Sequence, residues 1–304
     1  MKTNNTFVKY FVFAAICFFS FYSNSFADDL KVLKEKTFQI APGKKLKLDA
    51  SEGDVYIKSW DKSEVYVKIL GNHKAEEKME FSFDNDDNEV SIKAKKEGSF
   101  FGLWGSGIKL KFEITVPSDF NNYVRTSGGD IHLEGINGKQ DMKTSGGDVW
   151  VGMSGGDINV STSGGDINVD GSKGTIDLST SGGDIKGRNF SGSLSCSTSG
   201  GDIKLIGSNS YIKASTSGGD ISVSYTGENK GLELYTSGGE ISIMLPADFN
   251  ASAKLSTSGG EIDCEFKGNN AVKISSSKYI ADFNSGGNKL IAKSSGGDIT
   301  VKKQ

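Results

Sequence analysis

Hydrophobic and polar residues alternate in short runs along most of the chain, and from residue 127 the alternation recurs at a fixed interval. The segment T-S-G-G-D recurs every 18 residues, with its Ser at Ser127, Ser145, Ser163, Ser181, Ser199 and Ser217. Apolar residues follow that Ser at four, six, thirteen and fifteen positions, as Ile167, Val169, Ile176 and Leu178 follow Ser163. Each apolar pair alternates with polar residues, which is the period of a half-buried strand. One repeat therefore predicts two short strands and two turns.

Two such strands cannot bury their apolar sides alone, so the repeats must stack. Coils stacked at about 4.8 Å pair their backbones and close a narrow core between two sheets. The motif continues beyond the regular series at Ser237, Ser258 and Ser295. We therefore predict an all-β protein in which residues 123–304 form a parallel β-solenoid with a coil of about 18 residues and two strands.

Residues 28–122 also alternate, but less regularly. Ser51-Glu52-Gly53-Asp54-Val55 is a degenerate copy of the repeat motif, which favours an irregular β-rich N-terminal cap that is continuous with the solenoid. A small β-sandwich covering the solenoid is the alternative. The octapeptide I-T-V-P-S-D-F-N at residues 114–121 recurs as I-M-L-P-A-D-F-N at residues 243–250, which indicates two related blocks, each with a longer connection through Pro.

Residues 1–27 have the organisation of a secretory signal peptide. Lys2 and Lys9 precede an apolar run over residues 11–21, and Ser25 and Ala27 occupy the small-residue positions before the expected cleavage site. An uncleaved anchor is the alternative. We expect an exported protein in the periplasm, on the cell surface or outside the cell, with no membrane span after the signal is removed.

The T-S-G-G-D motif itself reads mainly as a turn. Two Gly permit positive φ, and Ser and Asp can bond to nearby backbone amides. The Thr that precedes Ser has the parity of the inward residues, which predicts a hydroxyl ladder at the corner of the core. Cys196 and Cys264 fall at inward positions several coils apart, beyond the roughly 7 Å that a disulfide tolerates, so both are expected to be small buried side chains.

Composition and motifs disfavour several classes of function. The net charge of −3 gives no basic excess, so nucleic-acid binding is not expected. The chain contains no H-x-x-x-H, C-x-x-C or G-x-S-x-G motif. We therefore predict that the protein is not an enzyme and needs no cofactor. A carbohydrate-active solenoid enzyme is the less favoured hypothesis.

Two groups of residues are candidates for binding. The acidic residues of the motif should stack one per coil, where their mutual repulsion would favour a Ca²⁺ ion. The proposed ligands are Asp148, Asp166, Asp184, Asp202 and Asp220. The second group consists of apolar residues in a Gly- and Ser-containing stretch, which as an exposed loop would contact a partner and otherwise would fold over the solenoid end. These residues are Phe100, Phe101, Leu103 and Trp104.

With its repeats in view, the chain resembles a broad bacterial family of unknown function whose members are described as candidate adhesins. The resemblance rests on the serial T-S-G-G-D-I motifs, on the opening Ser51–Val67 with Trp60-Asp61, and on I-T-V-P at residues 114–117. It covers nearly all of the chain after residue 27. The resemblance implies a β-solenoid, placement in the periplasm or at the surface, and no known catalytic residues.

The sequence thus favours an adhesin or surface-binding module that contacts a glycan or a cell-surface protein through its polar outer faces. The alternative is a periplasmic structural or envelope-stress protein without an adhesive role.

Overall fold

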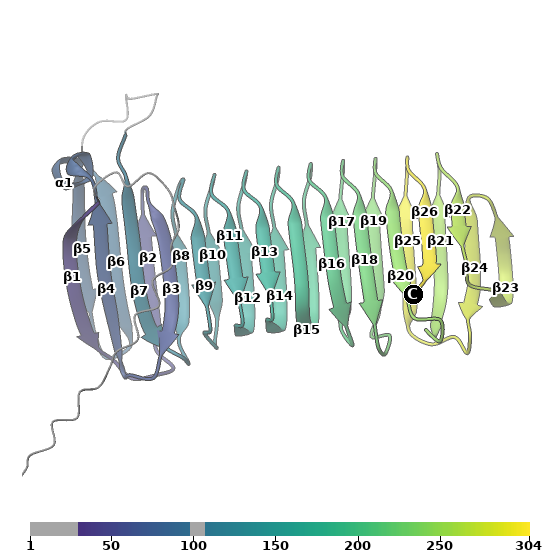
Figure 1. The fold of residues 1–304 in the computed structure, drawn as a ribbon, viewed down its shortest axis with the longest axis horizontal. Helices are drawn as coiled ribbons and strands as arrows, with labels where there is room; N and C mark the ends of the chain where they lie inside the picture. The colour runs from purple at the N-terminus through teal and green to yellow at the C-terminus, as the bar shows by residue number, and fades with distance from the viewer. Residues whose placement is uncertain (1–29, 98–106) are drawn as a thin grey trace, which may run out of the picture.

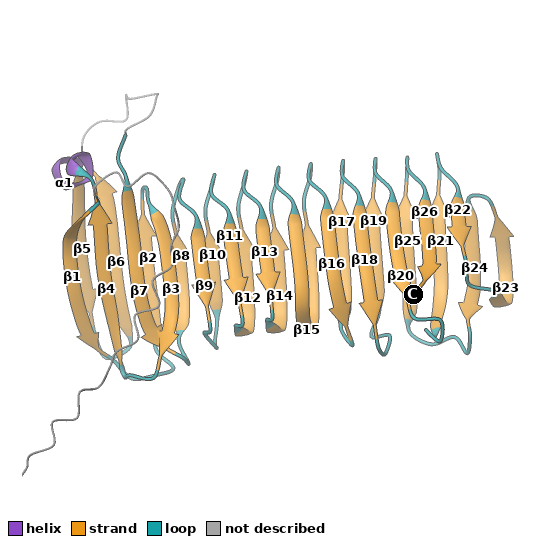
Figure 2. Cartoon of the chain, viewed as in Figure 1, coloured by secondary structure: helices purple, strands orange, loops and turns teal. Residues whose placement is uncertain are grey.

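The computed structural model describes residues 30–97 and 107–304, which form 26 strands and one short helix, α1 (His73–Lys78). The strands stack along one long axis as two facing sheets, with β1 and β5 at one end and β23 at the other (Figure 1). Loops line both long edges of the stack, where the chain passes between the sheets (Figure 2). This is the predicted all-β solenoid.

Sheet A contains the strands that follow the T-S-G-G-D turns. In spatial order its strands are β1 (Lys31–Gln39), β4 (Glu64–Gly71), β7 (Leu110–Pro117), β3 (Asp54–Trp60), β9 (Ile131–Glu134), β11 (Val149–Gly152), β13 (Ile167–Asp170), the first part of β15 (Ile185–Ser197), β16 (Ile203–Ser208), β18 (Ile221–Thr226), β20 (Ile241–Leu245), β26 (Ile299–Lys303) and β22 (Ile262–Cys264).

Sheet B contains the strands that precede those turns. In spatial order its strands are β5 (Met79–Asn85), β6 (Glu89–Lys96), β2 (Lys45–Ala50), β8 (Asn121–Arg125), β10 (Gln140–Lys143), β12 (Gly155–Ser161), β14 (Lys173–Ser179), the second part of β15, β17 (Tyr211–Thr216), β19 (Leu232–Thr236), β25 (Lys289–Ser294), β21 (Ala251–Thr257), β24 (Lys278–Phe283) and β23 (Gly268–Ser275).

The 18-residue period sets the register between coils. Val149 on β11 lies opposite Ile167 on β13, and Ile158 on β12 lies opposite Ile176 on β14. Because side chains alternate along each strand, every second residue points inward. The apolar residues of both sheets therefore form a single core, in which Ile167 is 0% and Leu178 is 3% exposed. Parallel pairing in one register repeats the same inward and outward positions in coil after coil.

The corner turns differ from their prediction in one respect. Gly182 and Gly183, like the other glycine pairs of the regular series, are not in the left-handed region, so the expected positive φ is wrong there. The second Gly is instead needed because the coils stack closely: a Cβ on Gly183 would overlap the carbonyl oxygen of Gly165 in the preceding coil. The motif requires Gly for backbone approach rather than for backbone conformation.

The inward Thr of each motif is buried, as its parity predicts. The Thr180 hydroxyl donates to the carbonyl oxygen of Gly165 at 2.9 Å and accepts from the amide of Gly183 at 3.3 Å. The hydroxyls therefore form a ladder through the backbone of neighbouring coils rather than by bonding to one another. Each Thr hydroxyl thus gives a hydrogen-bond partner to one carbonyl and one amide at the corner, where the backbone is not paired within a sheet.

The N-terminal region joins the solenoid without a break in pairing. β2 pairs in parallel with β8, and β3 pairs in parallel with β9, so the degenerate motif at residues 51–55 forms the corner of a coil. β6 and β7 form a further coil beyond it. β1, β4 and β5 then add antiparallel strands at that end. The described residues show a cap continuous with the solenoid, while the division at residue 122 stays a prediction.

The recurring octapeptide marks the two places where the chain steps over a coil. β7 pairs with β3, but β8, which follows β7 in the chain, pairs with the far side of β2, so residues 117–120 cross the coil β2–β3. In the same way, the connection from β20 to β21 crosses the coil β25–β26, which lies between the two. The first and last coils in sequence are thus internal in space. A buried Phe, Phe120 or Phe249, lies in each crossing connection.

Both described cysteines are free thiols. Cys196 is buried in β15, as predicted, whereas Cys264 in β22 is only partly buried. Burial raises the pKa of the Cys196 thiol to about 12. We expect Cys196 to resist iodoacetamide in the folded protein near pH 8 and to react in urea, because only the thiolate is a nucleophile. Mass spectrometry of alkylated peptides measures this, and rapid native labelling would contradict the buried position.

Candidate functional site

Three ring side chains form a row on the outer face of sheet A, which we call the aromatic ladder. Tyr56 on β3, His132 on β9 and Trp150 on β11 are paired residues of adjacent strands. The ring centroids of His132 and Trp150 are 4.0 Å apart with an interplanar angle of 14°, and those of Tyr56 and His132 are 5.8 Å apart. The Lys111 ammonium lies 4.4 Å from the centre of the Tyr56 ring. The ladder gives this outer face a stacked, partly exposed aromatic surface.

The aromatic ladder is absent from the sequence-based candidates, although its signal is present. Tyr56, His132 and Trp150 each lie five positions after the Ser of a motif copy. That offset is outward and carries polar residues in the following coils, beginning with Asn168 and Lys186. Only alignment of the degenerate first copy with the regular ones brings the three rings into one column.

Gly152 and His132 fix the orientation of Trp150. The benzo edge of the indole lies directly over Gly152, where any Cβ would overlap it. One face of the indole stacks on His132, so the opposite face is turned toward β13. Burial lowers the pKa of His132 and so favours its neutral imidazole, while the nearby Glu134 carboxylate opposes this shift. His132 and Gly152 therefore hold the Trp150 indole of the aromatic ladder in one orientation.

A groove begins at that free face of Trp150; we call it the Trp150 groove. It has a volume of about 460 Å³ and crosses β11, β13, β15 and β16. Its lining residues are Trp150, Asn168, Val169, Asp170, Lys186, Arg188, Lys204 and Ile206. Three are cationic and one is a carboxylate, so the lining carries a net positive charge on a chain of net charge −3.

The cations of the Trp150 groove are only loosely engaged. Arg188 lies 3.4 Å from Asp170, and Lys186 lies 3.6 Å from Asp184. The side chains of Arg188 and Lys186 are 63% and 49% exposed. Exposed pairs of this kind contribute at most about 1 kcal/mol. An incoming anion can therefore replace these carboxylates at little cost.

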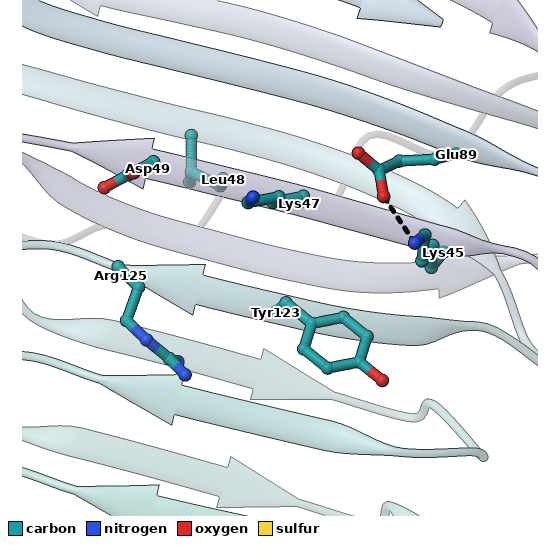
Figure 3. A pocket seen from close by; sticks show the side chains of 7 residues that line it. All are labelled: Lys45, Lys47, Leu48, Asp49, Glu89, Tyr123 and Arg125. Atoms are coloured by element: carbon teal, nitrogen blue, oxygen red, sulfur yellow. Dashed lines mark ion pairs between the residues drawn. The ribbon is translucent and has the colours of Figure 1, made fainter. Parts of the chain in front are cut away.

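A smaller hollow of about 260 Å³ lies on the outer face of sheet B near the N-terminal end (Figure 3). Its principal charges are already paired within the protein. Lys45 contacts Glu89 at 2.6 Å, and that hydrogen bond raises the pKa of Lys45. Both terminal guanidinium nitrogens of Arg125 donate hydrogen bonds to the Asp141 carboxylate, at 2.9 and 3.0 Å. This hollow is therefore less suited to an anionic ligand than the Trp150 groove.

The predicted acidic ladder runs along the corner of the coils, one carboxylate per coil. Each carboxylate has a backbone partner in the next coil: Asp202 accepts from the amide of Asp220 at 2.8 Å, and Asp184 accepts from that of Asp202 at 2.9 Å. Within residues 30–97 and 107–304, no three His, Cys, Asp or Glu side chains converge as a metal site. The geometry gives these residues a structural role, and Ca²⁺ binding stays a prediction.

Two substitutions separate the hydrogen bond of this ladder from its charge. Asp202→Asn keeps an acceptor oxygen, so we expect the free energy of unfolding to change by less than about 0.5 kcal/mol, whereas Asp202→Ala should lower it by about 1 kcal/mol. Urea denaturation measures both. If the ladder binds Ca²⁺, millimolar Ca²⁺ raises the Tm of the unmodified protein and Asp202→Asn reduces that rise; an unchanged Tm would exclude the metal site.

The predicted contact residues Phe100, Phe101, Leu103 and Trp104 lie outside the described residues, and their role stays a prediction. No helix in the described part of the chain is long and apolar enough to cross a membrane.

Comparison with known proteins places the fold in a family. A model of the Toastrack DUF4097 family matches residues 43–302. The chain belongs to this family. Toastrack proteins are β-solenoids, in agreement with the two-sheet stack described above. No curated protein matches the Toastrack chain in sequence.

Solved structures similar to this Toastrack chain are distant in sequence. A candidate adhesin from Bacteroides fragilis is 14% identical, with a TM-score of 0.43, and the match covers 91% of this chain and 98% of that one. A candidate lipid-binding protein from Parabacteroides distasonis is also 14% identical, with a TM-score of 0.43, and the match covers 89% of this chain and 96% of that one. A candidate adhesin from Parabacteroides merdae is 12% identical, with a TM-score of 0.30, covering 89% and 95%.

Proposed function

We propose that this Toastrack protein is an exported, non-catalytic adhesin or surface-binding module that contacts a glycan or a cell-surface protein through its outer sheet faces. The observation that carries the proposal is the aromatic ladder with its adjoining groove on the outside of sheet A. The inner faces are filled by core side chains, so ligand contacts are left to the outer faces and the edges.

The solenoid suits this role because it presents outward residues at fixed positions. Parallel strands repeat about every 4.8 Å, so outward side chains of successive coils form straight rows along a rigid surface. A surface that is already ordered loses little conformational entropy on binding. Repeated weak contacts along one extended ligand then add through effective concentration.

The alternative is a periplasmic structural or envelope-stress protein without an adhesive role. The long stacked sheets described above would serve a scaffold equally well. The two functions differ in location and in binding, so both must be measured.

Fractionation of cells that express the full chain, together with binding of the purified protein to intact cells, tests the proposal. We expect the protein in an exported fraction and saturable binding that unlabelled protein displaces. Retention on cells in proportion to added protein, without saturation, would count as non-specific adsorption. A periplasmic protein that binds neither cells nor isolated envelope glycans would instead support the structural alternative.

A further inference from the structure

We propose that the Trp150 groove is the ligand site of this protein and that its ligand is an acidic saccharide, a sugar chain that carries carboxylate groups. The inference rests on the proposed function and adds to it a location and a chemical class. Three features of the groove carry it: an aromatic wall, a cationic floor and an orientation along the solenoid axis.

The aromatic wall fits a sugar ring. The C–H groups on one face of a pyranose are weakly positive and apolar, so they pack on the negative face of an indole. Trp150 offers such a face toward β13, because its other face is stacked on His132. The indole is already immobilised by His132 and Gly152, so binding costs little further side-chain entropy.

The cationic floor selects an acidic sugar over a neutral one. Arg188 and Lys186 make only long ion pairs, and Lys204 has no ion pair among the described residues. A guanidinium binds a carboxylate through two parallel hydrogen bonds, and the lysines add charge. Asn168 and Asp170 line the same groove and can bond to sugar hydroxyls.

The orientation of the groove suits a chain rather than a single sugar. Asn168, Lys186 and Lys204 are paired residues on successive strands β13, β15 and β16, so they form one row along the solenoid axis. Neighbouring side chains in such a row are about 4.8 Å apart. An oligosaccharide laid along this axis would meet Trp150 first and then one polar or cationic side chain per coil.

A lipid surface fits the site less well. Membrane contact through an outer face requires apolar side chains that protrude into the interface. The Trp150 indole is partly buried between His132 and the sheet, and Ile206, at 43% exposure, is the exposed large aliphatic side chain among the described lining residues. The groove therefore offers a ring face and charges rather than an inserting patch.

Binding of defined tetrasaccharides to the purified mature chain tests the proposal. The acidic probes are tetragalacturonate and tetramannuronate, and the neutral probe is cellotetraose, each measured by isothermal titration calorimetry. We expect at least one acidic probe to bind and cellotetraose to bind at least tenfold more weakly. Trp150→Ala should weaken acidic binding about tenfold. Lys186→Gln with Lys204→Gln should weaken it by a similar factor and reduce its salt dependence.

Matched variants control for folding and for surface effects. Tyr235→Ala removes an aromatic side chain from the outer face of sheet B, beside Lys293, and should leave binding unchanged. Gly152→Ala displaces the indole without a positive-φ penalty and should weaken binding even if Trp150→Ala fails to fold. Circular dichroism reports the fold of each variant.

Several results would overturn the site. Absence of binding to both acidic probes does so, as does equal binding by Trp150→Ala and the unmodified protein. Binding to phosphatidylglycerol vesicles that Trp150→Ala abolishes would assign the groove to lipid instead. If cells still bind the protein saturably while both acidic probes fail, the adhesive function stands and this site assignment falls.

Discussion

Replacing Gly183 with Ala is expected to lower the free energy of unfolding by about 3 kcal/mol or more, while Gly182→Ala changes it by less than about 1 kcal/mol. The two glycines are adjacent and belong to the same turn, and neither has positive φ. A Cβ on Gly183 would overlap the carbonyl oxygen of Gly165, which belongs to the backbone of the preceding coil. A Cβ on Gly182 would lie 3.7 Å from the nearest atom, an ordinary contact.

The overlap at Gly183 has no inexpensive relief. The neighbouring group is backbone, and the Gly165 carbonyl already accepts the Thr180 hydroxyl that closes the corner. Moving the coils apart would lengthen the ladder bonds of both sheets on either side. At Gly182, by contrast, Ala restricts the unfolded chain and so offsets any small contact cost.

Urea denaturation of the two single variants measures the difference, with circular dichroism at the β-sheet band as the signal. Because repeat proteins can unfold in parts, the onset of the first transition is compared as well as its midpoint. Equal stability of the two variants would mean that the coils are not packed as closely as the corner geometry indicates.

Most of the fold could be predicted from the 18-residue period of the sequence. Eighteen residues with apolar positions at four fixed offsets determine which residues point inward, because a one-residue shift would expose the whole apolar set. That reasoning extended correctly to Ser51–Val55, whose copy of the motif is degenerate. It failed for the glycines of the turn, since a close approach between backbones leaves the same residue type in the sequence as a positive φ does.

The order of the coils at the two ends was beyond sequence reasoning. The coil β25–β26 lies between two coils that precede it in the chain, and no local period encodes that position. The site was partly accessible: the shared offset of Tyr56, His132 and Trp150 was available, whereas the indole position over Gly152 depends on side-chain packing. Neither the acidic ladder's backbone bonds nor the groove follows from residue spacing alone.

The connections that step over a coil lead to a second large effect. Phe249→Ala is expected to lower the free energy of unfolding by about 3–5 kcal/mol, the usual range for removing a fully packed Phe. Phe249 is 2% exposed and packs edge-on against Tyr225 at 5.6 Å. Asn229 then links this connection to the last coil, because its amide donates to the carbonyl oxygens of Asn250 and Asn288.

Phe249 therefore lies in the connection that crosses the C-terminal coil, and removing its side chain should destabilise that coil first. We expect amide hydrogens of β25 and β26 to exchange faster in Phe249→Ala, with little change in β9–β14, because the coils contact only their neighbours. Met244→Ala, which removes a side chain that is 46% exposed on the preceding strand, is the matched control and should leave both exchange and stability unchanged.

The same reasoning applies to the other end of the molecule. Phe120 holds the same place in the copy of the octapeptide that steps over β2–β3, and it is fully buried. Phe120→Ala should therefore speed exchange in β2 and β3 while leaving β25 and β26 protected. If either Phe variant loosened both ends equally, the loss would be a general one, and the octapeptide would not act as a local support for the coil it crosses.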